Sequence, residues 1–148
     1  VAALLCAAFG GDAEARLVRD LRRDGDLLLA LVAEDAGGIV GYIAFSPVVG
    51  LGMSAAALAP LAVLPERQRG GIGLTLVERG LAWLAGEGLR LVFVLGDPAY
   101  YSRFGFAAGT AWPFRTPYDG PHQLARWLAE PARAGGHATY ARAFACLG

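Results

Sequence analysis

The residues with the most distinctive chemistry lie between Leu61 and Gly73. The apolar run Leu61-Ala62-Val63 is followed by a basic, glycine-rich stretch over 65–73, after which the apolar spacing becomes helical. The first backbone N–H groups of a helix lack intrahelical partners and lie at the positive end of its dipole, and glycines leave them uncovered. Arg67 and Arg69 add guanidinium groups, which bind phosphate oxygens. The stretch therefore predicts a site for a phosphorylated ligand.

Two other phosphate-binding motifs do not fit this stretch. A P-loop requires a lysine after its second glycine, and the chain contains no lysine. A dinucleotide fingerprint requires a third glycine where Leu76 stands, and an acidic residue about twenty positions further on, where Arg90 and its apolar neighbours stand. A glycine-rich turn without a ligand remains the structural alternative.

A more specific pattern runs through the same turn. Gln68, Gly71 and Gly73 form Gln-x-x-Gly-x-Gly, preceded by Leu-x-Val-x-Pro. This combination resembles the acetyl-CoA-binding motif of the GNAT superfamily of N-acetyltransferases, whose turn holds the pyrophosphate of coenzyme A. The resemblance implies acetyl-CoA as the cofactor, and it places the backbone N–H that polarises the acetyl carbonyl between Leu61 and Val63. The cofactor-binding residues that it implies are Leu61, Ala62, Val63, Gln68, Arg69, Gly70, Gly71, Ile72 and Gly73.

A second motif follows the apolar run at 90–95. Side chains just beyond the carboxyl ends of parallel strands line the ligand crevice of such sheets, so this segment is placed to meet the cofactor. Tyr101, Gly105 and Phe106 form Tyr-x-x-x-Gly-Phe, which resembles the GNAT segment whose tyrosine approaches the coenzyme sulfur. The resemblance implies Tyr101 as the catalytic general acid that protonates the departing thiolate. Tyr100 is the second candidate, and a packing role is the alternative for both.

The sequence does not name a general base. Many GNAT members carry a glutamate on the strand before the turn, but residues 55–64 contain no carboxylate. Glu66, Asp97, His122 and His137 are unranked candidates, and a water relay to solvent is an equal alternative. The missing carboxylate also keeps a catalytically degenerate acetyl-CoA-binding module open as the alternative function.

Length and composition limit the class of protein. The 148 residues fit a single N-acetyltransferase-like domain over residues 1–148, large enough to build a core without metal or disulfide support. With 13 basic and 13 acidic side chains, the chain lacks the basic excess of nucleic-acid-binding proteins. No apolar run reaches the ~18 residues of a membrane span, and neither cysteines nor histidines show metal-ligand spacing. We therefore expect a cytoplasmic protein with no metal site, nucleic-acid partner or membrane segment.

Periodicity and turn residues predict alternating helices and strands. Pro60 lies inside one predicted strand, and because proline has no N–H to donate, it predicts pairing interrupted by a bulge or splay. In GNAT relatives the corresponding strand parts from its parallel neighbour, and the pantetheine arm fills the gap. The predicted helices cover 1–9, 13–23 and 71–86, and the predicted strands cover 27–33, 39–45, 55–64 and 90–95, with a loop over 46–54. The resemblance favours a final antiparallel pair of strands over 123–128 and 137–141, although the alanine and arginine of the first segment leave a helix there as the alternative.

Together with the resemblance, these elements predict an α/β fold with a GNAT-like mixed, twisted central sheet flanked by helices. The chain starts without Met inside an apolar helical pattern, so we expect the first strand of the fold to be missing from this sequence. The predicted reaction is direct transfer of the acetyl group from acetyl-CoA to an amine of a small molecule or peptide. A homodimer is compatible with the sequence, although no motif indicates one.

An aromatic segment is expected to form the acceptor side of the site. Polyamines and aminoglycosides would favour a strongly anionic groove, and the chain has little acidic clustering beyond Glu34 and Asp35. Aromatic walls with one or two cations favour a small apolar or carboxylate-bearing amine, such as an amino acid or a peptide N-terminus. The alternative is that these aromatics complete the core. The residues are Trp112, Phe114, Arg115, Tyr118 and Trp127.

Overall fold

A five-stranded sheet with the order β1-β2-β3-β4-β5 forms the centre of the fold. The structure is a computed structural model that describes residues 1–132 and 135–147. Neighbouring strands are antiparallel except for β3 and β4, which run parallel. The predicted α/β fold with a mixed sheet is therefore confirmed. The strands are β1 (Leu29–Asp35), β2 (Gly38–Val48), β3 (Ala55–Val63), β4 (Leu91–Leu95) and β5 (Gln123–Trp127).

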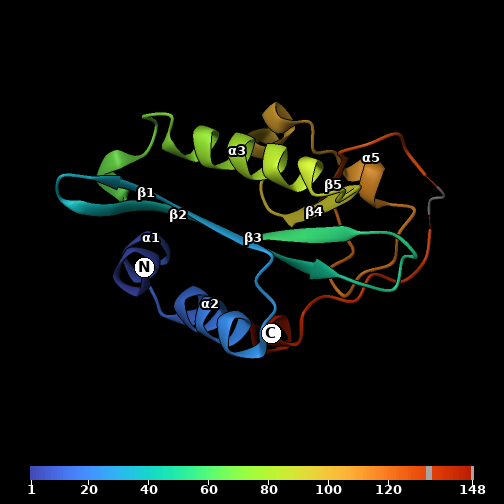
Figure 1. The fold of residues 1–148 in the computed structure, drawn as a ribbon, viewed down its shortest axis with the longest axis horizontal. Coiled ribbons are helices and arrows are strands. Elements are labelled where there is room, and N and C mark those ends of the chain that lie inside the picture. Colours follow the sequence, from blue (N-terminus) through green and yellow to red (C-terminus); the bar gives the residue numbers. More distant parts are fainter. Residues whose placement is uncertain (133–134, 148) are drawn as a thin grey trace.

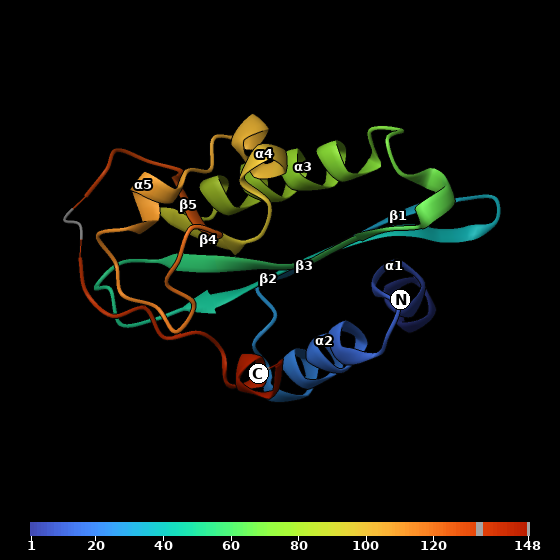
Figure 2. The same cartoon turned by 180° about the vertical axis from the view of Figure 1, so that it is seen from behind.

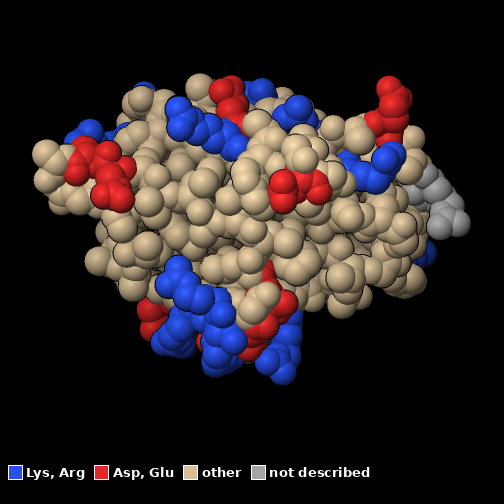
Figure 3. Space-filling model, in the orientation of Figure 1, with Lys and Arg blue, Asp and Glu red and all other residues tan. Residues whose placement is uncertain are grey.

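Helices cover both faces of the sheet (Figures 1 and 2). The long helix α3 and the short helix α4 lie on one face, and α1, α2 and the C-terminal turn η3 lie on the other. Figure 3 shows basic and acidic side chains gathered at the lower edge of the molecule, where α2 lies. The helices are α1 (Ala2–Phe9), α2 (Ala13–Asp24), α3 (Ile72–Gly86), α4 (Pro98–Tyr101) and α5 (Ala108–Ala111), and the 3-10 turns are η1 (Pro65–Arg67), η2 (Ser102–Phe104) and η3 (Arg142–Leu147).

The core is divided by the sheet. On the α3 side, the helix buries the face that its periodicity predicts, and this face packs on Ile43, Phe45 and other side chains of the sheet. On the other side, Leu4, Leu5 and Val18 of α1 and α2 pack against strands β2 and β3. Because side chains alternate along a strand, each face of β3 contacts a different helical layer.

The first hairpin differs from the prediction in its boundaries. The turn is tighter than expected, since the Gly37 N–H donates to Asp35 Oδ1 at 2.8 Å and Asp35 pairs directly with Gly38. Strand β2 continues to Val48, which pairs with Ala55, so the first part of the predicted loop over 46–54 belongs to the sheet. Pairing with a distant strand, rather than local composition, sets these ends.

Pro60 marks the point where the parallel pair separates. Strand β3 pairs with β4 from Ala55 to Leu58, whose partner is Val94, and then continues to Val63 beside β2 alone. The register between β2 and β3 shifts opposite this point, between Ile43 and Phe45. The interruption predicted from the missing proline N–H is therefore present, and it opens a gap between β3 and β4.

The predicted final strand pair is wrong. Strand β5 forms as predicted, but residues 137–141 make isolated bridges, in which His137 pairs with Arg115 and Thr139 with Val49. The outer edge of β5 is instead occupied by Ala107, whose N–H donates to Ala125 O at 3.0 Å while the Ala125 N–H donates back at 3.1 Å. A second strand cannot pair along an edge that is already bonded at its centre.

Gly80 offers a test of the packing between α3 and the sheet. A Cβ at this position would lie 2.5 Å from Cε2 of Phe45. Gly80→Ala should therefore lower the free energy of unfolding by up to about 2 kcal/mol, because an overpacking cost of ~1–3 kcal/mol is offset in part by a helix-propensity gain of ~1 kcal/mol. Urea denaturation, monitored by circular dichroism, measures the change in the free energy of unfolding.

Gly86→Ala is the matched control, because a Cβ there meets nothing within 4 Å in the same helix. It should be neutral or stabilising by up to about 1 kcal/mol. Equal stability of the two variants would contradict the close contact between α3 and Phe45.

Candidate active site

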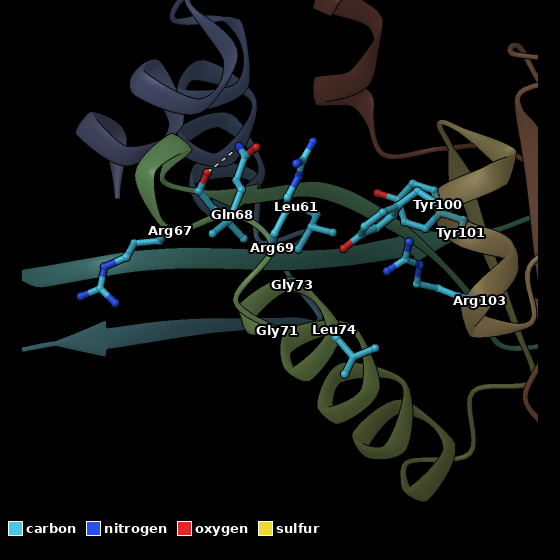
Figure 4. A pocket seen from close by; sticks show the side chains of 11 residues that line it. Leu61, Arg67, Gln68, Arg69, Gly71, Gly73, Leu74, Tyr100, Tyr101 and Arg103 are labelled. Carbon is cyan, nitrogen blue, oxygen red and sulfur yellow. Dashed lines mark hydrogen bonds between the residues drawn. The ribbon is translucent and has the colours of Figure 1, made fainter.

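The turn between β3 and α3 presents the amino end of a 15-residue helix. Arg69 and Gly71 have left-handed backbone conformations, with φ of 70° and 86°. Gln68 ties the turn to the end of β3, since its Nε2 donates to Val63 O at 3.2 Å (Figure 4). Within the described chain, no side chain caps the first amides of α3. These N–H groups therefore remain available to an anion at the positive end of the helix dipole.

A cavity of about 650 Å³ lies beside this turn. Three elements surround it: the end of β3 beyond its separation from β4, the turn with the start of α3, and the segment that follows β4 (Figure 4). The site thus forms at the carboxyl end of the parallel strand pair, as expected for an α/β sheet. The lining residues are Leu61, Val63, Arg67, Gln68, Arg69, Gly71, Gly73, Leu74, Tyr100, Tyr101 and Arg103.

The predicted site residues are all close in space, but three of them do not line the cavity. Ala62 is 3% exposed and packs with α1 and α2 on the opposite face, because side chains alternate along β3. Ile72 packs into the core, where a Cβ at Gly41 would lie 2.7 Å from its Cγ2. Gly70 lies outside the lining. Leu61, Val63, Gln68, Arg69, Gly71, Gly73 and Tyr101 do line the cavity.

Leu74 and Arg103 are lining residues that the sequence motifs did not single out. Arg103 follows Tyr100 by three positions in a helical segment, so the two side chains share a face, and its guanidinium carbon lies 4.8 Å from the Tyr100 ring centroid. This spacing could have identified Arg103. Arg67 forms an ion pair with Asp35 at the tip of the β1–β2 hairpin, so part of its charge is compensated.

Tyr101 is held by a cluster of aromatic rings. Its ring meets Tyr100 edge to face at 5.0 Å between centroids and Phe106 at 5.9 Å. It also packs on Gly96, where a Cβ would lie 2.6 Å from its Cε2. Burial, with a smaller contribution from the Tyr100 phenol, raises the pKa of Tyr101 to about 12. The phenol is therefore protonated, and a potential proton donor, throughout the neutral range.

The Tyr100 hydroxyl lies against the start of α3. A Cβ at Gly73 would be 2.6 Å from Tyr100 Oη, so the absence of a side chain at Gly73 gives this phenol its room. Burial raises the pKa of Tyr100, although the nearby Arg103 charge opposes the shift. Both neighbouring tyrosines thus contribute to the cavity, and Tyr100 is the one that contacts the glycine turn.

None of the four candidate bases lines the cavity in the described part of the chain. Asp97 caps α4, since its Oδ1 accepts from the Ala99 N–H at 3.0 Å. His122 Nδ1 lies 3.2 Å from Gly96 O, just beyond β4. Glu66 and His137 are exposed. The described residues also contain no cluster of His, Cys, Asp or Glu suited to a metal ion.

The five residues predicted to form the acceptor wall are divided between the core and two concave surfaces. Phe114 is buried, with ring contacts to Phe93 at 5.6 Å and to Trp127 at 6.1 Å, so these two of the five complete the core. Trp112, Phe114 and Arg115 together line a different concave surface, which also includes Asp119. Tyr118 is the one member of the five that lines a separate cavity, at the gap between β3 and β4.

Comparisons with known proteins are consistent across sequence and structure. The family model for the acetyltransferase (GNAT) domain matches residues 26–108. The chain is 48% identical over 122 residues to the uncharacterized N-acetyltransferase YhbS of Escherichia coli K12, covering 80% of this chain and 72% of that protein.

Two solved structures also match over nearly the whole chain. The crystal structure of E. coli YhbS in complex with CoA has a TM-score of 0.91 and 40% identity, and the match covers 99% of this chain and 86% of that one. A GNAT family acetyltransferase from Brucella melitensis in complex with acetyl-CoA has a TM-score of 0.76 and 37% identity, and the match covers 97% of this chain and 85% of that one.

Among the described residues, none of the helices combines the length and the apolar character that a membrane span requires.

Proposed function

The chain belongs to the GNAT acetyltransferase family, and from that premise we propose that it transfers the acetyl group of acetyl-CoA directly to an amine. The observation that carries the proposal is the cavity in which three features meet: the uncapped amino end of α3, the separated end of β3, and Tyr101. Each of these features suits a different part of the thioester substrate. The related structures that contain CoA or acetyl-CoA support the same assignment.

The start of α3 suits the phosphates of the coenzyme. Its first N–H groups are uncapped by described side chains, and Gly71 and Gly73 leave the backbone open. Arg69 and Arg103 line the same cavity and add positive charge. A chain with balanced charge overall thus concentrates cations and helix-dipole charge where an anion would bind.

The separated edge of β3 suits the amide-containing arm of the coenzyme and the acetyl carbonyl. Leu64 N–H donates to Val40 O, toward β2, so strand alternation turns the backbone groups of Leu61 and Val63 toward the gap. Val63 O already accepts from Gln68. In the proposed reaction, an N–H on this edge stabilises the negative charge that develops on the carbonyl oxygen.

Tyr101 is proposed to donate its phenolic proton to the departing thiolate. The general acid must be protonated when it acts, and burial raises the pKa of Tyr101 to about 12. Its packing on Gly96 and against Phe106 fixes the ring at the end of β4. Tyr100 is the alternative donor, because its hydroxyl reaches the glycine turn.

A panel of amines tests the proposed reaction. Each amine is incubated with the protein and acetyl-CoA, and turnover is monitored by the release of the coenzyme A thiol. The panel should contain monoamines, amino acids, peptides and aminoglycosides, and at least one amine should release coenzyme A well above the hydrolytic background. Calorimetry with coenzyme A runs in parallel. Tight binding without transfer to any amine would favour the catalytically degenerate binding module instead.

Coenzyme binding should depend on the open turn. Gly71→Glu adds a carboxylate at a residue with φ of 86°, and Gly73→Glu adds one where a Cβ already lies 2.6 Å from Tyr100 Oη. Both place negative charge where the phosphates are proposed to bind, and each should weaken the affinity for coenzyme A at least about 100-fold by calorimetry.

Gly86→Glu is the matched control, because it places the same charge at the far end of α3 with no atom within 4 Å of its Cβ. It should bind coenzyme A like the wild type. Folded Gly71→Glu and Gly73→Glu proteins with wild-type affinity would remove the turn from the proposed site.

Loss of the Tyr101 hydroxyl should slow the reaction. Tyr101→Phe should lower kcat by about 10²-fold or more, which is typical of a lost general acid, and leave the affinity for coenzyme A nearly unchanged. Tyr100→Phe should have the smaller effect. Steady-state kinetics with the best amine of the panel give the ranking. The reverse ranking would assign the proton to Tyr100, and equal, small losses would exclude both.

A further inference from the structure

A second cavity opens at the gap between β3 and β4. Its volume is about 240 Å³, and it is lined by Leu58 and Val94, the last residues of the parallel ladder, and by Leu95 just beyond them. Its far wall consists of Tyr118, Tyr140 and Phe144. Phe144 belongs to η3, which lies on the sheet face opposite to α3 and α4 (Figures 1 and 2). The gap is thus approached by the first cavity from one face and by this cavity from the other.

The second cavity contains no charged lining residue in the described chain. Its walls are aliphatic side chains and aromatic rings, and Phe93, Tyr140 and Phe144 are packed together with centroid distances of 6.3 Å and 5.4 Å. A polycationic amine would leave its additional charges without counter-ions in such a place. A carboxylate would likewise lack a cationic partner.

The hydroxyl hydrogens of Tyr118 and Tyr140 are already donated in hydrogen bonds within the protein. Tyr118 Oη donates to Phe144 O at 3.3 Å, and because a carbonyl can only accept, the direction of this bond is fixed. Gln123 is oriented by Val94 O, which accepts from its Nε2 at 3.4 Å. Gln123 Oε1 therefore accepts from Tyr140 Oη at 3.3 Å. The phenols retain acceptor lone pairs, which suit an N–H group and do not suit a carboxylate.

The size of the cavity further restricts which ligand it can hold. At about 240 Å³ it is smaller than the ~300–1,000 Å³ typical of pockets for drug-sized ligands. It accommodates one ring or a short alkyl chain, whereas an aminoglycoside is far larger. An amine in these apolar surroundings also loses solvation of its charged form, which favours the neutral nucleophile.

We propose that this cavity holds the acceptor, and that the acceptor is a small primary monoamine with an apolar, otherwise uncharged carbon skeleton. The inference rests on the acetyl transfer proposed above. The amine nitrogen forms a bond to the acetyl carbon, the carbon–sulfur bond breaks, the thiolate receives a proton, and the nitrogen releases one proton to solvent. The amide and free coenzyme A are the two products.

The test compares three amines of one skeleton: 2-phenylethylamine, L-phenylalanine, which adds a carboxylate, and L-phenylalaninamide, which adds similar bulk without the charge. In the thiol-release assay, kcat/KM for 2-phenylethylamine should exceed that for L-phenylalanine at least about tenfold, with the amide much closer to 2-phenylethylamine. Spermidine should be slower than 2-phenylethylamine. L-phenylalanine or spermidine as the best substrate would overturn the proposal.

Leu95 allows the charge argument to be tested at the cavity itself. It lines the cavity and is 52% exposed, so a longer side chain can extend from this position. Leu95→Arg should raise kcat/KM for L-phenylalanine relative to 2-phenylethylamine about tenfold or more, because the guanidinium supplies the missing partner for the carboxylate. The matched variant Trp83→Arg adds the same charge at an exposed residue that lines neither cavity, and it should keep the wild-type ratio. A ratio that Leu95→Arg leaves unchanged would exclude this cavity as the acceptor site.

Calorimetry separates this inference from the reaction on which it rests. 2-phenylethylamine is titrated into protein saturated with coenzyme A, so that binding is measured without turnover. Binding without any acetyl transfer would retain the acceptor site and refute the reaction. Transfer to other amines with neither binding nor turnover of 2-phenylethylamine would retain the reaction and refute the acceptor class.

Discussion

The separation of β3 from β4 after Leu58 and Val94 is the constraint on which the rest of the site depends. Strand β3 continues to Val63 with β2 as its partner in the sheet, so one of its edges faces the gap. Backbone N–H and C=O groups without partners are costly when they are buried, and sheets normally satisfy them by pairing. Pro60 removes one donor at the point of separation, and the cavities on both faces of the sheet meet the strands there. An interruption that would weaken an ordinary sheet thus leaves, among the described strands, an unpaired edge of β3 at the proposed site of transfer.

The glycine turn and the tyrosine segment act on the same cavity although they lie about one helix apart in the sequence. The glycine turn follows β3, and α3 then runs back along the sheet. Tyr100 and Tyr101 follow β4 and line the same cavity as the turn. The two segments are in contact, because a Cβ at Gly73 would lie 2.6 Å from Tyr100 Oη. Gly73 therefore serves two purposes, since it exposes backbone at the start of α3 and leaves room for a phenol. A glycine that appeared from the motif to serve the ligand alone also serves a neighbouring side chain.

The sequence predicted those features that depend on local periodicity or on backbone chemistry. The helices α1 to α3, strand β4, the glycine turn and the interruption at Pro60 all follow from the spacing of apolar residues or from glycine and proline geometry. Features that depend on distant partners were missed or misjudged. The length of β2 is set by pairing with β3, and residues 137–141 are excluded from β5 because Ala107 occupies its edge. Ala62 fails to line the cavity because the alternation of a strand cannot be assigned to a face until the packing is known.

The two faces of the gap offer different environments for the two protons of the proposed reaction. On the α3 side, burial raises the pKa of Tyr101 to about 12, so the phenol keeps its hydrogen at neutral pH and can donate it in a hydrogen bond to a developing thiolate. On the opposite side, the aromatic cavity has no charged lining residue in the described chain, and its tyrosine hydrogens are already donated to Phe144 O and Gln123 Oε1. On the side of the second cavity, a carboxylate base on β3 would meet no charged lining residue in the described chain that could compensate its charge. If the amine enters the gap already neutral, the remaining proton can leave to solvent after the nitrogen has bonded to carbon. Residues 55–64 contain no carboxylate that could act as a general base. This agrees with the apolar character of the second cavity, because both features favour an acceptor amine that is deprotonated without a protein base.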